Sequence, residues 1–436
     1  MFFDIGLDLF PLLAAVFAAV SCALLGNFLV LRRLSLMGDA ISHSVLPGLV
    51  IAFLITSTRS PIAMFAGAAI AGVATVVLVE FVKRFGRVES GAAMGVVFSI
   101  LFALGVLLIE QAAARHVDLD ADCVLHGQLE TLVWYSAPDS FGGLFTLQTL
   151  QQTPRQVKTL AITLILAIGF VTLLFKELRL AAFDSALATT LGFNATFLHY
   201  LLMIFVATAT VASFEAVGSI LVIAMLICPA AVARLFTDRL GSQIICSVIV
   251  ALICSIGGYF SATILPSAFG IDAVNAAGAM AMMGGIVLAI AVFVSPSHGV
   301  ISRVIRRRRL SGRVALDDLL AAIFRATEKG QLQPTRTELQ IGFAHANLHR
   351  TIQRANHLQL VEPIGTQQVR LTESGMQAAS EVVRRHRLWE HYLVEKVGLA
   401  PDHVHETAEL LEHLPPRPPQ GPESDPHGKV IPKGFS

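Results

Sequence analysis

Residues 7–33 read LDLFPLLAAVFAAVSCALLGNFLVLRR, an apolar run that ends in two arginines. A bilayer with a hydrocarbon core about 30 Å thick is crossed by roughly 20 apolar helical residues, so this run is long enough to span it. No basic segment precedes the run and no cleavage site is evident. We therefore expect a retained membrane helix and not a signal peptide.

The composition of the whole chain supports a membrane protein. Of its 436 residues 54% are hydrophobic and 14% are charged, and the mean hydropathy is +0.68, which is too apolar for an ordinary soluble protein. The apolar runs stop near Val294, and the chain is soluble in character after the arginines at 306–309. The net charge of +1 averages these two halves and therefore indicates neither a nucleic-acid partner nor an acidic one.

The sequence predicts an all-α polytopic membrane protein with eight or nine transmembrane helices over residues 1–300. The seventh stretch is interrupted by Gly218 and Pro229, which leaves eight full spans as the alternative. With nine spans every Arg- and Lys-rich loop lies on one side, which is the cytoplasmic side, together with the C-terminus. We therefore prefer nine. The stretches are 7–31, 39–57, 61–82, 91–110, 159–175, 197–214, 217–236, 243–265 and 275–295.

Few ionisable residues lie in these spans, and each is a functional candidate because its insertion is costly. Asp39 and His43 are four residues apart, share one helix face, and form a plausible half-site for Zn²⁺, Mn²⁺ or Fe²⁺. The alternative is that Asp39 caps the helix and His43 is interfacial. Glu215 either lines the pathway or is solvated at a span end. His199 and Glu80 lie at span ends, where snorkelling explains them.

The chain has no GxxxxGK[ST] loop to hold nucleotide phosphates. We therefore expect it not to be an enzyme and not to hydrolyse ATP alone. A partner or an ion gradient must then supply the energy for transport. The internal repeat that is common in gradient-driven carriers is not evident.

Three stretches carry a family resemblance: LRRLSLMGDAISHSVLPG (31–48), ELRLAAFDSALATTLGF (177–193) and VGSILVIAMLICPAAVARL (217–235). They resemble the manganese, zinc and iron permeases of binding-protein-dependent ABC importers, and DLDADCVLHGQLE (118–130) is similar to a segment of one subgroup. The resemblance implies a bacterial inner-membrane permease subunit that carries a divalent transition metal and binds no permanent cofactor. It also implies three kinds of partner: a second permease copy or paralogue, cytoplasmic ATP-binding subunits, and an extracytoplasmic metal-binding protein.

The same resemblance assigns roles to residues. Asp39 and His43 match the pair that is thought to contact the metal in transit. The cytoplasmic loop that begins at Phe183 matches the coupling helix that docks into the ATPase, and a surface turn is the alternative. The matching residues of that loop are Phe183, Asp184, Leu191 and Gly192.

A soluble domain follows a basic linker at 301–315. We expect helices at 316–330, 335–343 and 345–359 and a hairpin at 360–375, in the order of a winged helix-turn-helix. The third helix presents polar side chains that could reach DNA, and a solvated helix face explains them equally well. These side chains are His349, Arg350, Gln353 and Arg354.

Residues 376–414 form a helical region rich in nitrogen and oxygen ligands. The six candidates lie within fewer than thirty residues, although a solvated charged face remains an alternative. The absence of cysteine among them favours Mn²⁺ or Fe²⁺ over structural zinc. The candidates are His386, Glu390, His405, Glu409, Glu412 and His413.

From residue 316 to residue 413 the chain also resembles the iron- and manganese-dependent repressors of the diphtheria toxin repressor type. That resemblance implies one metal held by His386, Glu390 and His405. It implies a second metal held by Glu409, Glu412 and His413 together with Asp317 or Asp318. The dimerisation region is truncated into a proline-rich tail at 415–436, of which only ESDPHGKVIP (423–432) still resembles the family.

Two functions are compatible with these features. The first is an ATP-driven metal importer subunit whose cytoplasmic domain senses imported metal. The second is a membrane-anchored, metal-responsive DNA-binding regulator. Nine spans are excessive for an anchor, so the first is preferred.

Overall fold

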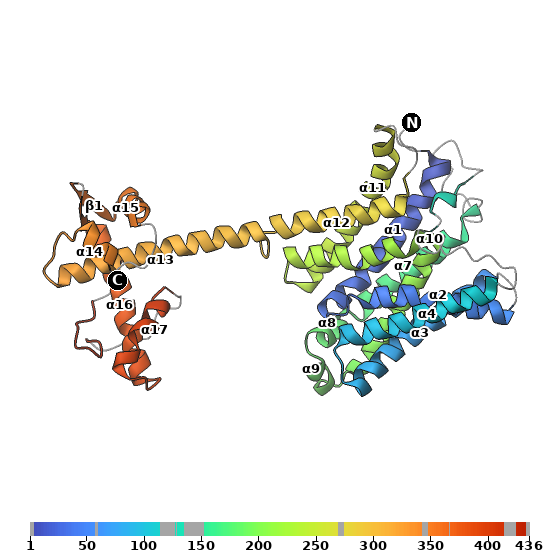
Figure 1. Ribbon diagram of the computed structural model, residues 1–436, viewed down its shortest axis with the longest axis horizontal. Coiled ribbons are helices and arrows are strands. Elements are labelled where there is room, and N and C mark those ends of the chain that lie inside the picture. Colours follow the sequence, from blue (N-terminus) through green and yellow to red (C-terminus); the bar gives the residue numbers. More distant parts are fainter. Residues whose placement is uncertain are drawn as a thin grey trace. The chain divides into compact units, whose positions relative to one another are not determined.

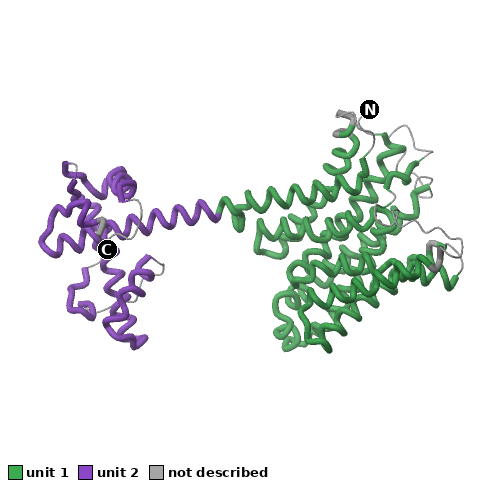
Figure 2. Tube along the Cα trace, in the orientation of Figure 1, with its two compact units in different colours: residues 1–302 green, residues 303–436 purple. Residues whose placement is uncertain are grey.

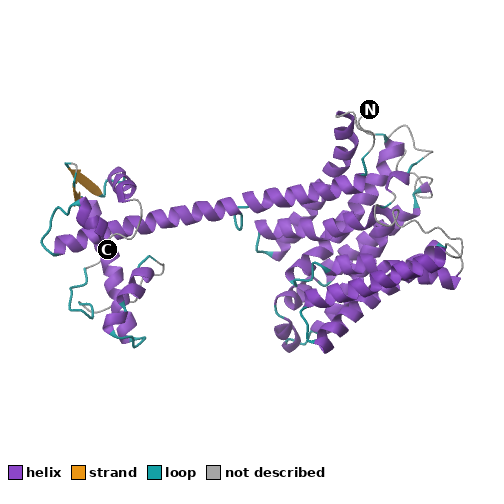
Figure 3. Ribbon diagram, viewed as in Figure 1, coloured by secondary structure: helices purple, strands orange, loops and turns teal. Residues whose placement is uncertain are grey.

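The computed structural model describes residues 4–56, 60–113, 127, 129–134, 152–268, 274–341, 348–365, 367–413 and 424–432. The chain divides into two compact units, residues 1–302 and 303–436 (Figure 2). Each unit is described by itself below. Within the described residues the first unit is helical, and the strands belong to the second (Figure 3).

Among its described residues, the first unit contains eight helices that are long and apolar enough to cross a membrane (Figure 1). They are α1 (Ile5–Leu31), α2 (Met37–Thr56), α3 (Pro61–Gly86), α4 (Ser90–Ala113), α7 (Arg155–Leu173), α10 (Ala195–Phe236), α11 (Leu240–Ala268) and α12 (Ala276–Val294). The described residues between them also form the shorter helices η1 (Leu129–Thr131), α8 (Phe175–Phe183) and α9 (Ser185–Thr190).

Helix α10 consists of two legs that run in opposite directions. Its 42 residues would span about 63 Å if straight, roughly twice the hydrocarbon core. Gly218 breaks the helix with φ 75° and ψ 166°, a conformation that is open essentially to glycine alone. Near the start of α10, His199 Nδ1 lies 3.0 Å from Nη1 of Arg32 at the end of α1. Near its end, the Leu235 carbonyl accepts a hydrogen bond from Ser295, which follows α12.

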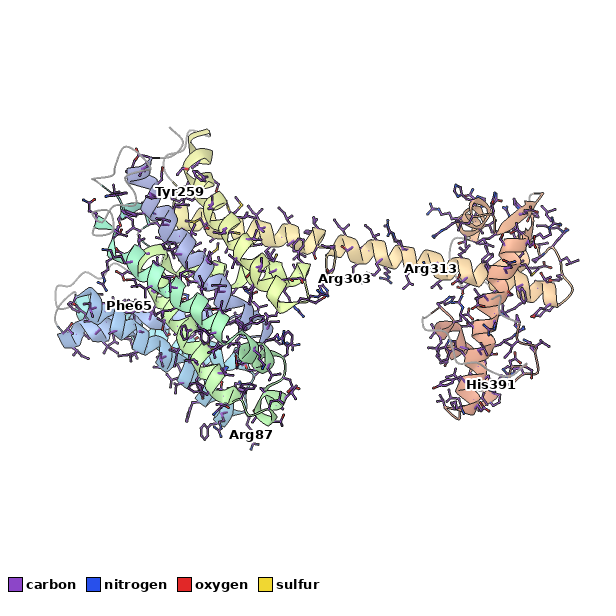
Figure 4. The ribbon with its side chains drawn as sticks, turned by 180° about the vertical axis from the view of Figure 1, so that it is seen from behind. Phe65, Arg87, Tyr259, Arg303, Arg313 and His391 are labelled. Carbon is purple, nitrogen blue, oxygen red and sulfur yellow. The ribbon has the colours of Figure 1, made fainter. Side chains whose placement is uncertain are left out.

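The ends of α1 and α12 lie on the same side because both helices run antiparallel to α11. Asp8 Oδ1, at the start of α1, accepts a 2.7 Å hydrogen bond from Tyr259 late in α11, whereas Asn27, late in α1, bonds Ser247 at 2.6 Å early in α11. Figure 4 labels Tyr259 and Arg87 at opposite ends of the bundle. Both ends of α10 therefore lie at the Arg87 end, and the eight described helices make nine crossings, as the preferred topology predicted.

Close packing of small residues holds the first unit together. Helix α1 buries a stripe of alanines, from Ala14 to Ala23, which lets its neighbours approach closely. A Cβ atom at Gly26 would lie 1.9 Å from the Leu226 carbonyl oxygen in the second leg of α10, so only glycine fits there. Helices α3 and α4 expose large apolar side chains such as Ile70 and Leu107, as lipid-facing helices do.

The second unit has the predicted order of three helices and a hairpin. Its helices are α13 (Val300–Glu328), α14 (Arg336–Ile341), α15 (Leu348–His357), α16 (Glu373–Glu395), η3 (Pro401–His403) and α17 (His405–Leu411). Strands β1 (Val361–Ile364) and β2 (Gln368–Leu371) pair antiparallel, with Val361 opposite Leu371. Leu319 and Ile323 of α13 are fully buried in one core with Val361 and Val369.

The basic stretch 301–315, which the sequence predicted as a linker, is helical. It forms the first half of α13, on which Figure 4 labels Arg303 and Arg313. Arginine, leucine and isoleucine are compatible with a helix, and no proline interrupts them. The expected first helix of the soluble domain therefore begins earlier, at Val300.

Two sequence predictions fall partly outside the described residues. Of 118–130, the structure describes only Gly127, Leu129 and Glu130, and of the proline-rich tail only 424–432. In that described part of the tail Asp425 is buried, and its carboxylate lies 3.7 Å from Nε of Arg387 in α16. The segment that resembles the repressors is thus packed against α16.

Candidate metal and docking sites

The pair Asp39 and His43 lies on the first turns of α2. The helix begins at Met37, so Asp39 lies inside its first turn and is not its N-cap. Its Oδ1 atom lies 3.4 Å from His43 Nε2, and the two side chains are 39% and 25% exposed. The His43 ring packs against Phe98 and Phe102 of α4, at 5.0 and 5.7 Å between ring centroids. The carboxylate and imidazole thus face each other and keep an open side for a further ligand.

Glu215 lies on the first leg of α10, three residues before the break at Gly218. Its side chain is exposed although its neighbours Phe214 and Ala216 are buried. One turn earlier, Val211 packs in a small cluster with Val45 of α2. The carboxylate and the Asp39–His43 pair are therefore carried by helices that pack against each other.

The predicted coupling loop is a pair of short helices, α8 and α9. Asp184 joins them and caps α9, since its Oδ1 accepts from the amides of Ala186 and Leu187 at 3.0 and 2.9 Å. Gly192 ends the turn in the left-handed region with φ 89°. This segment leads directly into the end of α10 that carries His199, and so lies at the cytoplasmic end of the bundle.

An apolar stripe covers this helix pair. Phe183, Leu187 and Leu191 are spaced by four residues, and they are 58%, 46% and 60% exposed. The extended backbone at Asp184 separates the two helices, so Leu187 and Leu191 share one side of α9 while Phe183 lies on α8, and exposed apolar side chains in such a group are typical of a docking surface for a protein. Sequence analysis named Phe183 and Leu191 and missed Leu187, which the four-residue spacing could have shown.

In the second unit, three ligand atoms from α16 and α17 converge. His386 Nε2 lies 3.1 Å from Glu390 Oε1 and 3.1 Å from His405 Nδ1, and the last two atoms are 2.9 Å apart. Two ligands of an octahedral ion that lie at about 2.1 Å from it are roughly 3.0 Å apart when adjacent. The chemistry and spacing of these donors therefore fit a divalent transition metal.

Glu412 contacts this site through the ring nitrogen of His386 that faces away from Glu390 and His405. Its Oε2 lies 2.7 Å from His386 Nδ1, inside the unit, where both side chains are almost fully buried. An imidazole that donates its Nδ1 proton to a carboxylate keeps Nε2 free to act as a ligand. Glu412 thus orients His386 toward Glu390 and His405.

A second cluster combines Asp318, Glu412 and His413. His413 Nε2 lies 3.1 Å from Asp318 Oδ1 and 3.7 Å from Glu412 Oε1, while its Nδ1 is 3.5 Å from Asp317 Oδ2. Helix α13 therefore supplies carboxylates, as the resemblance implied. Glu409 does not join this cluster: it is half exposed, and its carboxylate lies 3.7 Å from His405 Nε2 and 3.9 Å from Arg325 Nη1.

The ionisation of these groups follows from their partners. Burial opposes the charged imidazolium of His386, but hydrogen bonds to Glu390 and Glu412 outweigh it and raise its pKa. Burial likewise opposes charge on Glu390, yet its bonds to His386 and His405 lower its pKa to about 2. Hydrogen bonds to Asp317 and Asp318 raise the pKa of His413 to about 9. A metal ion at either cluster would therefore compete with protons.

The predicted DNA-contact residues are all exposed on α15. His349 Nε2 lies 3.0 Å from Gln353 Nε2, and Arg350 is exposed. Arg354 instead lies over the backbone of α13, since its Nη1 would be 2.4 Å from a Cβ atom placed at Gly312. The contact of this helix with DNA stays a prediction.

Sequence reasoning missed two charged positions. Arg387 is buried beside His386 and donates to both carboxylate oxygens of Glu328 in α13, at 3.0 and 2.6 Å. Arg32 bonds His199, whose other ring nitrogen lies 3.8 Å from Glu80. His199 and Glu80, which snorkelling was expected to explain at the span ends, therefore lie in one charged cluster with Arg32.

Comparison with known proteins identifies the parts. The model of the iron dependent repressor, metal binding and dimerisation domain matches residues 372–417, and that of the ABC 3 transport family matches residues 9–134 and 141–294.

Two relatives and one solved structure show how far the similarity extends. The manganese transport system membrane protein MntD of Bacillus subtilis is 40% identical over 67% of this chain and 93% of its own length. The zinc transport system membrane protein TroD of Treponema pallidum is 38% identical over 73% of this chain and 81% of its own. The structure of PsaBC from Streptococcus pneumoniae in complex with Fab is 27% identical with a TM-score of 0.53, over 69% of this chain and 94% of that one. The chain belongs to the ABC 3 transport family.

Proposed function

We propose that this chain is the permease subunit of an ATP-driven importer for a divalent transition metal, with Mn²⁺ or Zn²⁺ as the first candidates and Fe²⁺ as the third. The observation that carries the proposal is the Asp39–His43 pair, a carboxylate and an imidazole 3.4 Å apart on an otherwise apolar helix. Such groups are costly in a membrane and are retained for a substrate or a proton. The similarity to relatives named for manganese and zinc transport supports the choice of a divalent transition metal as the substrate.

A single permease of this kind presents only half of a pathway. Asp39 and His43 supply two donors, and Glu215 on the neighbouring helix α10 supplies a third. A divalent ion takes four or more ligands. A second permease copy or paralogue provides the remainder, and an extracytoplasmic metal-binding protein delivers the ion.

The energy comes from a separate cytoplasmic ATP-binding subunit. Its docking element is the stripe of Phe183, Leu187 and Leu191, held in place by the Asp184 cap and the Gly192 turn. Because α9 runs into α10 with only four residues between them, a movement of the stripe is transmitted to the leg that carries Glu215.

Transport is tested by reconstituting the complete importer, with its binding protein and ATPase, in liposomes. ATP-dependent uptake of ⁵⁴Mn²⁺ and ⁶⁵Zn²⁺ is expected, and Asp39→Asn should reduce it at least about tenfold. Glu89→Gln, which removes an exposed carboxylate ahead of α4, is the matched control and should transport normally. Unchanged uptake by Asp39→Asn would leave the pair without a role in transport.

The cytoplasmic unit senses the imported metal in this proposal. His386, Glu390 and His405 would hold one ion, and Asp318, Glu412 and His413 a second. A bound ion would supply a cross-link between α16, α17 and α13 in place of protons. Uptake should therefore decline as metal accumulates inside the liposomes, and the double variant His386→Ala/His413→Ala should lose that decline while its initial rate stays unchanged. Identical inhibition of both proteins would refute sensing by these clusters.

Membrane anchoring of a DNA-binding regulator is the less favoured function. Nine crossings are more than an anchor needs, and the chain belongs to a transport family. The exposed residues of α15 leave DNA contact as an additional prediction, checked by electrophoretic mobility shift with the metal-loaded full chain.

A further inference from the structure

A cavity of about 490 Å³ lies at the cytoplasmic ends of the membrane helices, beside the proposed docking element. Its walls come from the end of α1, the end of α3, the α8–α9 pair and the start of α10. Sites for small molecules commonly measure 300 to 1,000 Å³, so the space is large enough for a ligand.

The lining carries an excess of positive charge. Three cationic side chains, Arg32, Arg33 and Lys83, face the cavity together with a single carboxylate, Glu80. That carboxylate is already shared, since Lys83 Nζ lies 3.4 Å and His199 Nε2 lies 3.8 Å from its Oε2. The cavity therefore has donors to spare for an anion.

Arg32 gives the most direct sign of a missing partner. Its Nη1 atom lies 3.0 Å from His199, but its Nε and Nη2 atoms are buried and have no hydrogen-bond partner among the described residues. A guanidinium is always charged, and leaving its N–H groups unpaired away from water costs free energy. An oxyanion that enters the cavity and draws Arg32 toward it would pair these groups.

We propose that this cavity binds the phosphate group of an anionic membrane phospholipid. The guanidinium fork matches two phosphate oxygens, and Arg33 and Lys83 add charge around it. Basic pockets between transmembrane helices on the cytoplasmic side are suited to such headgroups.

The apolar part of the lining favours a lipid over a free anion. Leu31, Leu34 and Tyr200 border the same space and can contact the glycerol and upper acyl carbons. A bound lipid would tie α1, α3 and α10 to Ala181 and Phe183 in the docking region. The proposal thus assigns lipid dependence to the permease, independently of which metal it carries.

The experiment uses the purified full chain in neutral detergent, with thermal unfolding and native mass spectrometry as readouts. Dioleoyl-phosphatidylglycerol should raise the unfolding temperature and remain bound, while dioleoyl-phosphatidylcholine should do neither. Arg32→Gln should weaken the apparent affinity for phosphatidylglycerol at least about tenfold. Lys83→Gln, a milder change at the cavity wall, should weaken it less and covers the case in which Arg32→Gln does not fold.

The control is Arg84→Gln, which also removes one positive charge. Arg84 follows Lys83 in the sequence, but it is exposed and does not line the cavity. It should bind phosphatidylglycerol as the unmodified chain does. An equal loss of phosphatidylglycerol affinity in Arg84→Gln and Lys83→Gln would refute a specific binding site in the cavity.

Two further arms distinguish other sources of the anion. If inorganic phosphate alone stabilises the chain as much as phosphatidylglycerol does, the lipid assignment is wrong. If Arg32→Gln leaves lipid binding intact but weakens assembly with the ATP-binding subunit in neutral lipid, the cavity receives a protein carboxylate and the proposal fails.

Discussion

Glu412 Oε2 lies 2.7 Å from His386 Nδ1 in the interior of the cytoplasmic unit. The other oxygen of the same carboxylate lies 3.7 Å from His413 Nε2. One side chain therefore touches a member of each ligand cluster. Occupation of one cluster must change the electrostatic environment of the other.

This bridge predicts that Glu412→Gln weakens metal binding at both clusters. The amide removes a ligand from the second cluster and the charge that orients His386 in the first, so affinity should fall about 10- to 100-fold. Mn²⁺ titration of the full chain, followed by electron paramagnetic resonance, measures both sites. Glu406→Gln, an exposed position in the first turn of α17, is the control, and an equal loss there would contradict the bridge.

The pKa shifts predict how the metal-free cytoplasmic unit responds to pH. The pKa of His413 is raised to about 9, so its interactions stabilise the folded unit fully when the pH is below its ordinary pKa of 6.5. This stabilisation is lost as the pH rises through 9. The pKa of Glu390 is lowered to about 2, so its interactions stabilise the folded unit fully when the pH is above its ordinary pKa of 4.5. This stabilisation is lost as the pH falls through 2. The contribution of these two groups to the stability of the folded unit is therefore greatest between about pH 4.5 and pH 6.5.

Hydrogen exchange in α16 and α17 of the chelator-treated full chain, corrected for intrinsic rates, checks the alkaline side. Protection should fall between pH 6.5 and 9, and His413→Gln should flatten that change. Asp317, Asp318 and Glu412 are the carboxylates that face His413, and the His413→Gln variant separates its contribution from that of His386, whose pKa is also raised. Protection that rises with pH would contradict the assignment.

The reversal of α10 predicts that Gly218→Ala is destabilising. At φ 75° and ψ 166° an alanine is strained by about 1–3 kcal/mol, and the two legs would separate or shift. The unfolding temperature of the purified chain in detergent should fall. Gly169→Ala in α7 has open space around it and an ordinary helical backbone, so it should be neutral or slightly stabilising.

The exposed stripe predicts that Leu187→Glu uncouples the ATPase. A carboxylate in a desolvated apolar contact should weaken assembly at least about tenfold, or about 1.4 kcal/mol. Pull-down of the ATP-binding subunit and ATPase stimulation measure the effect. Thr189→Glu introduces the same charge on α9 outside the stripe and should assemble normally; equal loss in both variants would show a general effect of charge.

The amino-acid sequence alone predicts the membrane class, the sidedness and most helix positions. Apolar length and the asymmetric placement of arginine and lysine act locally, so they can be read without a structure. The i,i+4 spacings of Asp39 with His43 and of His386 with Glu390 likewise fix which side chains share a helix face. The order of the cytoplasmic elements followed from periodicity, and the expected hairpin turns at Gly365, between β1 and β2, with φ 60°.

Which faces meet follows from long-range packing. The placement of the basic loops predicted two spans in this region, but not that they form one long helix that is broken at Gly218 and packs against α1 and α12. Glu409 and Glu412 are one turn apart on the same face, yet only Glu412 is buried between the clusters, because its neighbours come from α16 and α13. Arg32 and His199 meet from 167 residues apart, a distance across which no local pattern carries information.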